Sequence, residues 1–275
     1  MHTAVNMEQY QSPQAENASG QRLRILSYNI QAGISISRFR HYLTHSWKHL
    51  LPYPHRLENL ERIAHTIRPF DIVGLQEVDG GSFRSDFINQ VEHLAEMGHF
   101  PYWYQQLNRN LGKLAQHSNG LLSRIRPSKI VEHKLPGLIP GRGAIAIHFG
   151  HGDETLVLII AHLALSRRAQ RQQIEFLCEL AGDFPHAVLM GDFNCSSNQL
   201  QSLPAVARAN LHEPLSGAST YPSWRPQHNL DHILVTPSLK INSVEVLKYT
   251  FSDHLPVSIE LSVPETVELQ KQGTF

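Results

Sequence analysis

The chain has 275 residues, of which 41% are hydrophobic and 17% are charged, so it can bury a sizeable core, and wholesale disorder is excluded. Its 24 Lys and Arg residues balance 24 Asp and Glu residues, which excludes a protein that binds nucleic acid by bulk positive charge. Any contact with a polyanion must therefore be local. Histidine, with 18 residues, is the one compositional excess and supplies many candidate ligands and bases.

Neither the N-terminus nor the cysteine content points to export or to a membrane. Two cysteines cannot support a disulfide framework, and the first residues carry no apolar signal segment. The longest apolar stretch is far shorter than the ~20 residues of a membrane span. We therefore expect a cytoplasmic protein with no integral membrane segment and no obligate protein partner. The composition also predicts a flexible N-terminal arm at 1–20, one domain over 21–263 and a flexible C-terminal tail at 264–275.

Hydrophobic periodicity predicts short strands that alternate with amphipathic helices. In chain order, the first elements are a strand at 24–29, a helix over 57–67 that ends before Pro69, a strand at 71–75 and a helix over 83–98. Two consecutive strands follow at 144–149 and 156–161, and then a helix that Ser166 caps and Gly182 closes. Strands at 187–190, 230–235, 243–247 and 255–261 complete the pattern. Such a mixture favours an α/β fold with sheets packed face to face and helices outside.

Polar side chains stand where the predicted strands end. An acid, amide or histidine directly follows the apolar run at Asn29, Glu77, His162, Asp192, Asn194, Asp231, Asp253 and His254. Any one of these is most often a turn former, a helix cap or a buried core residue. Capping does not require the whole set, however, and rigid strand ends can bring distant side chains together.

The residue types suit the hydrolysis of a phosphate ester. Carboxylates can hold Mg²⁺ or Mn²⁺, and such a hard cation offsets the charge that gathers on the phosphate oxygens. Glu77 is the best candidate ligand, with Asn29 and Asp253 beside it. A histidine oriented by a carboxylate can deprotonate water near neutral pH, and His254 with Asp231 is the natural pair.

The order of these short blocks resembles the endonuclease/exonuclease/phosphatase superfamily, which includes pancreatic deoxyribonuclease, apurinic endonucleases, deadenylases, inositol polyphosphate phosphatases and neutral sphingomyelinases. The blocks are Ser-Tyr-Asn29-Ile, Leu-Gln-Glu77-Val, Asn119-Gly-Leu-Leu-Ser-Arg124, Ala-His162-Leu, Gly-Asp192-Phe-Asn194, Leu-Asp231-His-Ile-Leu and Ser-Asp253-His254-Leu-Pro-Val. The resemblance covers about residues 22–262. It implies a four-layered α/β sandwich, with two mixed sheets face to face, helices on both outer sides and one active-site mouth at the strand ends.

The resemblance also implies a role for each matching position. Glu77 would bind the divalent ion, with Asn29 and Asp253 in or near its shell. Asp192 would orient or activate the attacking water, and Asn194 and His162 would contact the phosphate. Asp231 would pair with His254, which acts either as the base or as the group that polarises the phosphate.

Fewer residues bear on the choice of substrate. Asn119, Arg142 and Trp224 are the candidate substrate-binding side chains. The segment 34–56 carries basic and aromatic residues and no acid, which suits nucleic acid, an anionic membrane surface, or simple packing onto the domain. We expect a metal-dependent phosphodiesterase, and as the first reading a nuclease that acts as an endonuclease or exonuclease. The alternatives are a phosphoesterase acting on a phospholipid headgroup or a small phosphorylated metabolite, and a non-catalytic binding protein.

Overall fold

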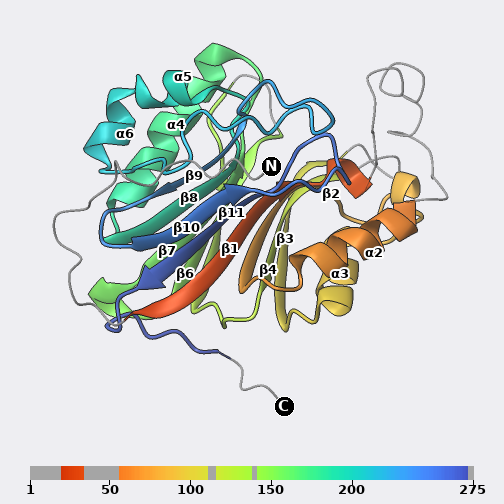
Figure 1. Cartoon of the computed structure of the whole chain (residues 1–275), viewed down its shortest axis with the longest axis horizontal. Helices are drawn as coiled ribbons and strands as arrows, with labels where there is room; N and C mark the ends of the chain where they lie inside the picture. Colours follow the sequence, from red (N-terminus) through yellow and green to blue (C-terminus); the bar gives the residue numbers. More distant parts are fainter. Residues whose placement is uncertain (1–19, 34–55, 111–115, 138–140, 272–275) are drawn as a thin grey trace.

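The computed structural model describes residues 20–33, 56–110, 116–137 and 141–271 (Figure 1). The predicted arm at 1–20, apart from its last residue, and nearly all of the basic segment 34–56 lie outside these residues. The first sheet has the strand order β10-β11-β1-β2-β4-β3 and the second has the order β5-β6-β7-β8-β9. The strands of the first sheet are β1 (Gln21–Asn29), β2 (Ile72–Asp79), β3 (Tyr102–Asn110), β4 (Gln116–Ser123), β10 (Lys240–Val246) and β11 (Val257–Val263). Those of the second sheet are β5 (Lys129–Lys134), β6 (Gly143–Phe149), β7 (Leu156–His162), β8 (His186–Asp192) and β9 (Asp231–Val235).

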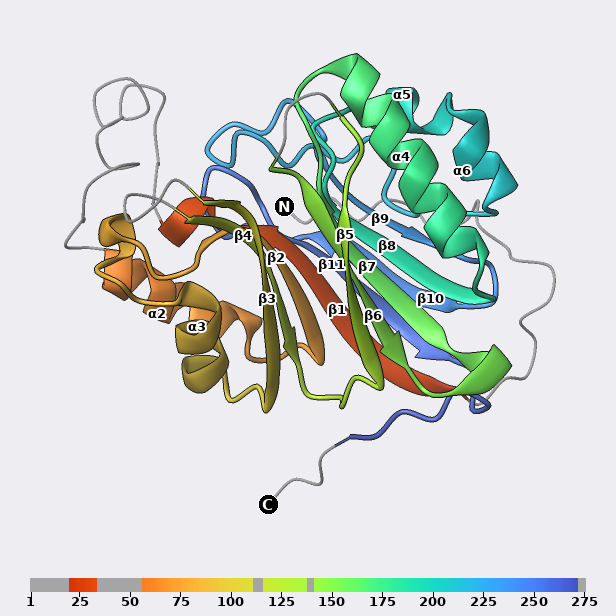
Figure 2. The same ribbon diagram turned by 180° about the vertical axis from the view of Figure 1, so that it is seen from behind.

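Helices cover the outer face of each sheet, so the molecule has four layers. The first sheet carries α2 (Arg56–Ile67) and α3 (Gln90–Gly98), and the second carries α4 (Arg167–Gly182), α5 (Ser197–Gln201) and α6 (Pro204–Arg208). The two groups of helices lie on opposite sides of the molecule, as Figure 2 shows from behind. One apolar cluster fills the space between the sheets, and a separate cluster lies under each helix layer. The predicted α/β sandwich is confirmed.

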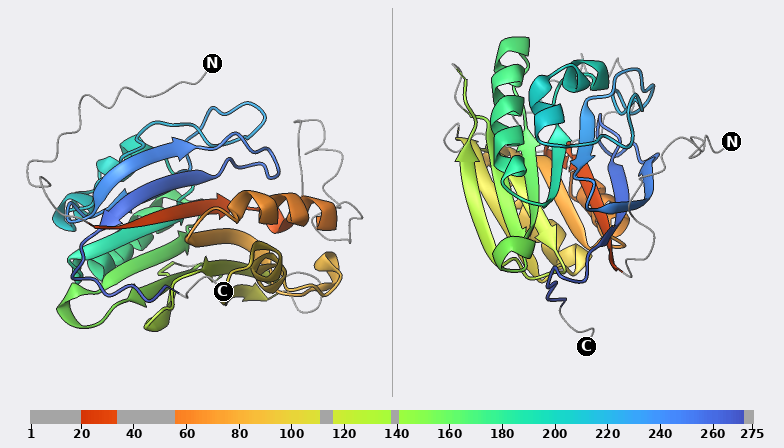
Figure 3. Two further views of the ribbon diagram at one scale, coloured as in Figure 1. Left: turned by 60° about the horizontal axis from the view of Figure 1, so that its bottom comes forward. Right: turned by 90° about the vertical axis from the view of Figure 1, so that its left-hand side faces the viewer.

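Both sheets are mixed, which places the polar ends of several strands at one edge. In the first sheet β1 is parallel to β2 and antiparallel to β11, and Figure 3 shows β1, in red, between these two neighbours. In the second sheet β7 is parallel to β8, which is antiparallel to β9. β7 and β8 are buried over their full length, as expected for strands covered on both faces. The polar residues at their carboxyl ends, His162 and Asp192, therefore lie at the edge where a functional site is expected.

The predicted helix over 83–98 is wrong in its first half. Residues 83–85 form a single 3₁₀ turn, and the α-helix begins at Gln90. The carboxylate of Asp79 accepts hydrogen bonds from Ser82 and Ser85 and holds this segment as a loop. Asn89 then caps the helix by accepting from two backbone N–H groups of its first turn.

Residues 264–271, which were expected to belong to a flexible tail, pack against the sandwich. Val267 is fully buried in the cluster between the sheets, and Thr266 donates a hydrogen bond to Glu154. The backbone of Lys271 forms a bridge with Ile125. The sequence signal was weak because this segment has few apolar residues, yet one of them enters the core.

Candidate active site

Three adjacent strands of the second sheet place three site residues side by side. In the register of β7, β8 and β9, His162 lies opposite Asp192, and Asp192 lies opposite Asp231. All three side chains are buried. In the first sheet Asn29 pairs with Gln76, the residue before Glu77. The two sheets therefore bring their polar strand ends to the same edge of the sandwich.

The segment Gly191-Asp-Phe-Asn194 has a distinct structural role at each position. A Cβ atom on Gly191 would lie 1.8 Å from the carbonyl oxygen of Ala161, so only glycine allows β7 and β8 to approach this closely. Phe193 is buried under the helix layer. Asn194 adopts a left-handed conformation, which asparagine tolerates well, and its N–H donates to Asp192 Oδ1 at 3.0 Å. This turn fixes the direction of the Asp192 carboxylate.

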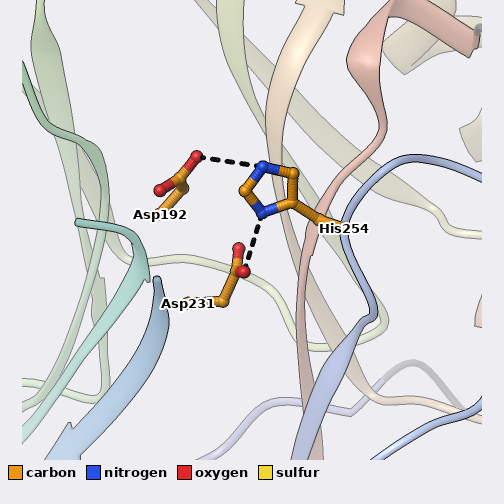
Figure 4. A group of neighbouring side chains, drawn as sticks. All are labelled: Asp192, Asp231 and His254. Atoms are coloured by element: carbon orange, nitrogen blue, oxygen red, sulfur yellow. Dashed lines mark hydrogen bonds and ion pairs between the residues drawn. The ribbon is translucent and has the colours of Figure 1, made fainter. Parts of the chain in front are cut away.

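A buried histidine and carboxylate form the predicted pair. His254 Nδ1 lies 2.8 Å from Asp231 Oδ2. Figure 4 marks this contact with a dashed line. The same oxygen accepts a hydrogen bond of 2.5 Å from the Thr220 hydroxyl. The ring of Tyr221 packs against the imidazole with a centroid distance of 4.9 Å. These contacts fix the ring of His254 and direct Nε2 toward Asp192.

The carboxylate of Asp192 is the centre of the group. Its Oδ2 accepts a hydrogen bond of 3.0 Å from the Asn29 amide, which joins the two sheets across the interface. The same oxygen lies 3.6 Å from His162 Nε2 and 3.7 Å from His254 Nε2. One oxygen atom therefore faces an amide and two imidazoles that come from three different parts of the chain.

Glu77 reaches the site through an irregularity in β2. The register with β4 shifts between Leu75 and Val78, and Glu77 has a φ of 54°, a costly conformation for a residue with a side chain. Its Oε1 lies 3.8 Å from His162 Nε2, and its side chain is 33% exposed. The bulge turns this carboxylate out of the sheet and toward the mouth of the site.

The site concentrates negative charge. Burial, together with the charges of Asp231 and Glu77, raises the pKa of Asp192 to about 6, against the opposing effects of His254 and the hydrogen bond from Asn29. Burial likewise raises the pKa of Asp253 to about 7, again with contributions from Glu77 and Asp192. Carboxylates that repel one another, with the amide of Asn29 beside them, offer the oxygen ligands that suit a hard divalent cation. The residues present therefore fit the predicted metal ion.

A second group of side chains also has a spacing that could hold an ion. One donor atom from each of Asp192, Asp231 and His254 lies within 4.8 Å of the others. Burial lowers the pKa of His254, but the Asp231 and Asp192 carboxylates raise it well above its ordinary value. A protonated imidazole repels a cation, so this trio is better suited to moving or sharing a proton.

The two histidines of the site differ in charge. Burial and the nearby positive charge of Arg142 hold the pKa of His162 well below its ordinary value. His162 is therefore neutral at pH 7, whereas His254 carries a proton. Of the two imidazoles that face the Asp192 carboxylate, one is therefore neutral and the other is protonated.

A cavity of about 760 Å³ opens beside Glu77 and His162, and it tests the predicted substrate-binding residues. Arg142 lines it. Asn119 and Trp224 do not line the cavity. Asn119 is fully buried and donates to the Gly143 carbonyl, whereas Trp224 is half-buried in the loop before β9. The structure therefore gives Asn119 a supporting position behind the cavity and not the substrate contact that the sequence suggested.

Several neighbours of the site were not identified from the sequence. Thr220 and Tyr221 contact the Asp231–His254 pair, and His117 and Arg168 line the cavity. None of them stands at the end of a predicted strand in an apolar run. A sequence pattern alone therefore gave no reason to choose them.

His232, directly after Asp231, faces the opposite side of β9 and supports the sheet. Its Nδ1 lies 2.5 Å from Glu213 Oε1, and its Nε2 donates to the Cys195 carbonyl at 2.8 Å. Burial lowers the pKa of His232, but these two hydrogen bonds raise it to about 10. The imidazolium and the carboxylate form a buried ion pair.

Replacing His232 by glutamine is expected to lower the free energy of unfolding by about 3 kcal/mol, because it leaves Glu213 buried without its counter-charge. Since the folded-state pKa lies above the unfolded value near 6.5, the stabilisation is complete below pH 6.5 and is lost as pH rises through about 10. Urea unfolding at pH 6 and pH 9 measures both effects. Arg171→Gln, which breaks the exposed pair with Glu175, should change little.

Comparison with known proteins adds to this geometry. The model of the Endonuclease/Exonuclease/phosphatase family matches residues 26–254. A search of curated proteins found no match. Within the described residues, no helix combines the length and apolar character of a membrane span.

Several solved structures are similar to this chain. A protein described as an endonuclease/exonuclease/phosphatase from Beutenbergia cavernae has 21% sequence identity and a TM-score of 0.67, over 88% of this chain and 72% of that one. A mannosyl-6-phosphatase of Bacteroides thetaiotaomicron has 19% identity and a TM-score of 0.65, over 87% and 99%. The catalytic domain of human nocturnin has 19% identity and a TM-score of 0.64, over 88% and 93%. At these identities the likeness concerns the fold.

Proposed function

Because the chain belongs to the endonuclease/exonuclease/phosphatase family, whose members hydrolyse phosphate esters, we propose that it is a Mg²⁺- or Mn²⁺-dependent phosphodiesterase. We further propose nucleic acid as the substrate, cleaved as an endonuclease or exonuclease would cleave it. The observation that carries the proposal is the position of Asp192 Oδ2, which faces Asn29, His162 and His254 beside Glu77. This arrangement supplies a carboxylate, two imidazoles and an open cavity at one point.

The metal ion would be held by Glu77 and Asp253, with Asn29 nearby. When bound, it would withdraw electron density from the phosphate and neutralise charge that develops there. The raised pKa values of Asp192 and Asp253 support this assignment, because a dication would relieve the repulsion between these carboxylates. The Asn29 amide oxygen accepts a hydrogen bond from the backbone N–H of Gln31, so this oxygen faces the turn that follows β1.

Asp192 and the two histidines that face it would each have a separate catalytic role. Asp192 would orient the attacking water and accept its proton, since its carboxylate is fixed by the Asn194 N–H and the Asn29 amide. His254, held by Asp231, would donate a hydrogen bond to the phosphate or the departing oxygen. His162 would contact the phosphate from the opposite side of Asp192.

A small phosphorylated metabolite is the second candidate substrate, and a specific observation favours it. The cavity of about 760 Å³ has the size typical of small-ligand sites. The balanced charge of the chain also gives no general attraction for duplex nucleic acid. A phospholipid headgroup remains a third possibility with no further support from the described residues.

The proposal predicts that purified protein hydrolyses bis(p-nitrophenyl) phosphate with Mg²⁺ or Mn²⁺, loses activity in EDTA and regains it when the metal is restored. A panel of single-stranded and double-stranded DNA, abasic DNA, RNA, sphingomyelin and phosphorylated sugars then identifies the substrate class. Hydrolysis that is indifferent to EDTA would contradict metal dependence. If a sugar phosphate is hydrolysed and all nucleic acids stay intact, the substrate is a small phosphorylated metabolite and not nucleic acid.

A further inference from the structure

The cavity beside the active site carries two arginines that the proposed reaction does not use. Its lining includes Arg142 and Arg168, together with the imidazoles of His117 and His162. Among the described lining residues Glu77 is the only acid, and it belongs to the proposed metal group. A volume of about 760 Å³ is much larger than one phosphate group requires. The cavity therefore has room for a part of the substrate beyond the scissile ester.

The backbone on either side of Arg142 requires glycine. Gly141 has a φ of 105°, which a residue with a side chain rarely adopts, and a Cβ on Gly143 would lie 2.2 Å from Asn108 Oδ1. The Arg142 carbonyl accepts from Leu135 N at 3.1 Å. The arginine therefore extends from a backbone of fixed conformation into the cavity.

Arg168 stands where a cation is unfavourable for the helix itself. It lies in the first turn of α4, which contains no acid, and a positive charge there opposes the helix dipole. Its side chain is exposed and lines the cavity. Arg167 opposes the dipole in the same turn but does not line the cavity, so its position at the cavity is what distinguishes Arg168.

The wall between these two arginines is also fixed. Gln173 is buried on α4, accepts from Ala164 N at 2.9 Å and donates to the Pro136 carbonyl at 2.9 Å. This polar residue interrupts the apolar stripe of the helix because it joins the segment after β7 to the segment after β5. These two hydrogen bonds fix the part of the cavity wall that Gln173 forms.

We propose that this cavity binds a second phosphate group of the substrate, with Arg142 and Arg168 as its two contacts. The inference rests on the proposed function and narrows it: the preferred substrate carries a phosphate next to the ester that is cleaved. Arginine suits this task because its planar guanidinium can give two parallel hydrogen bonds to phosphate oxygens. The second phosphate could belong to an adjacent nucleotide or to a small bisphosphorylated metabolite, which present the same chemistry.

The test uses two substrates that differ only in the second phosphate: thymidine 5′-(p-nitrophenyl phosphate) and its 3′-phosphorylated counterpart. The wild-type protein is expected to prefer the phosphorylated substrate at least about tenfold in kcat/KM, the range of a charge-assisted hydrogen bond. Arg168→Gln should reduce this ratio toward one, and Arg142→Gln should do the same while also lowering the rate on both. Arg167→Gln is the matched control, because Arg167 shares the first turn of α4 but does not line the cavity.

A binding measurement separates this inference from the proposed function. Titration calorimetry with thymidine 3′,5′-bisphosphate and thymidine 5′-monophosphate should show tighter binding of the bisphosphate, and Arg168→Gln should remove the difference. Equal kcat/KM values together with equal affinities would overturn the inference and leave the hydrolase intact. If neither ester is hydrolysed but the bisphosphate still binds more tightly, the proposed function fails and the cavity assignment stands. Competition by oligothymidylate or by fructose 1,6-bisphosphate then identifies the source of the phosphate, and competition by neither counts against the inference.

Discussion

Replacing Asp192 by asparagine is expected to lower kcat at least about a thousandfold, within the range expected for a group that moves a proton in the transition state. The amide cannot accept the proton of water, and it removes the charge that faces His254 Nε2 at 3.7 Å. Stability should change little, because two effects oppose each other. Burial raises the pKa of Asp192 to about 6, so asparagine removes the cost of an ionised carboxylate in the metal-free fold. The amide has only one acceptor oxygen, however, so either the Asn29 amide or the Asn194 N–H loses its acceptor.

Activity and thermal unfolding, measured on the same preparations, check both parts of this prediction. Asp183→Asn is the matched control, because this exposed aspartate lies at the end of α4, away from the cavity. It should leave both quantities unchanged. An Asp192→Asn protein that keeps more than about a tenth of the wild-type kcat, far above the loss expected for such a group, would rule out this role.

The sequence predicted the positions that converge because rigid strands carry them. His162, Asp192 and Asp231 each follow or begin a buried apolar run, and the register of three neighbouring strands brings them together. If such runs are strands of one sheet that end at the same edge, the polar residues at their ends must lie close together. The same reasoning found Asn29 at the end of β1, which donates to Asp192 across the interface between the sheets.

Features that depend on local backbone geometry or on loops could not be predicted in this way. The left-handed conformation of Glu77 arises from a bulge that no residue pattern predicts. β3, β4 and β5 were not predicted, because β3 and the first half of β4 are rich in polar residues and β5 is an edge strand with a half-exposed pattern. Thr220 reaches Asp231 from a loop whose path depends on the tertiary fold.

Asn119 shows how a correct block can still mislead about a role. It stands in a sequence block that resembles the family, yet its side chain is fully buried and bonded to Gly143. Arg142, the residue before Gly143, lines the cavity in its place. A motif therefore located this part of the site, and only the packing distinguished the buried residue from the one that lines the cavity.

Replacing Glu77 by glutamine is expected to have the second large effect, on metal binding as well as on catalysis. Loss of the carboxylate should lower the affinity for the metal ion at least about a hundredfold, and the rate of hydrolysis should fall with it. A loss of this size exceeds the range known for residues that only support a metal ligand. Without metal, the variant should be at least as stable as the wild type. Its neutral side chain ends the repulsion that Glu77 exerts on Asp253 and Asp192.

Thermal or urea unfolding with and without Mn²⁺ measures this independently of activity. At a metal concentration of 100 times the wild-type Kd, binding stabilises the wild type by about 2.7 kcal/mol and a hundredfold weaker variant by only about 0.4 kcal/mol. Glu175→Gln, on the exposed face of α4, should behave as the wild type does. Asp231→Asn distinguishes the alternative ion site of Asp192, Asp231 and His254. If Asp231→Asn removes the stabilisation by Mn²⁺ and Glu77→Gln retains it, the ion belongs to that trio, and Glu77 is not its ligand.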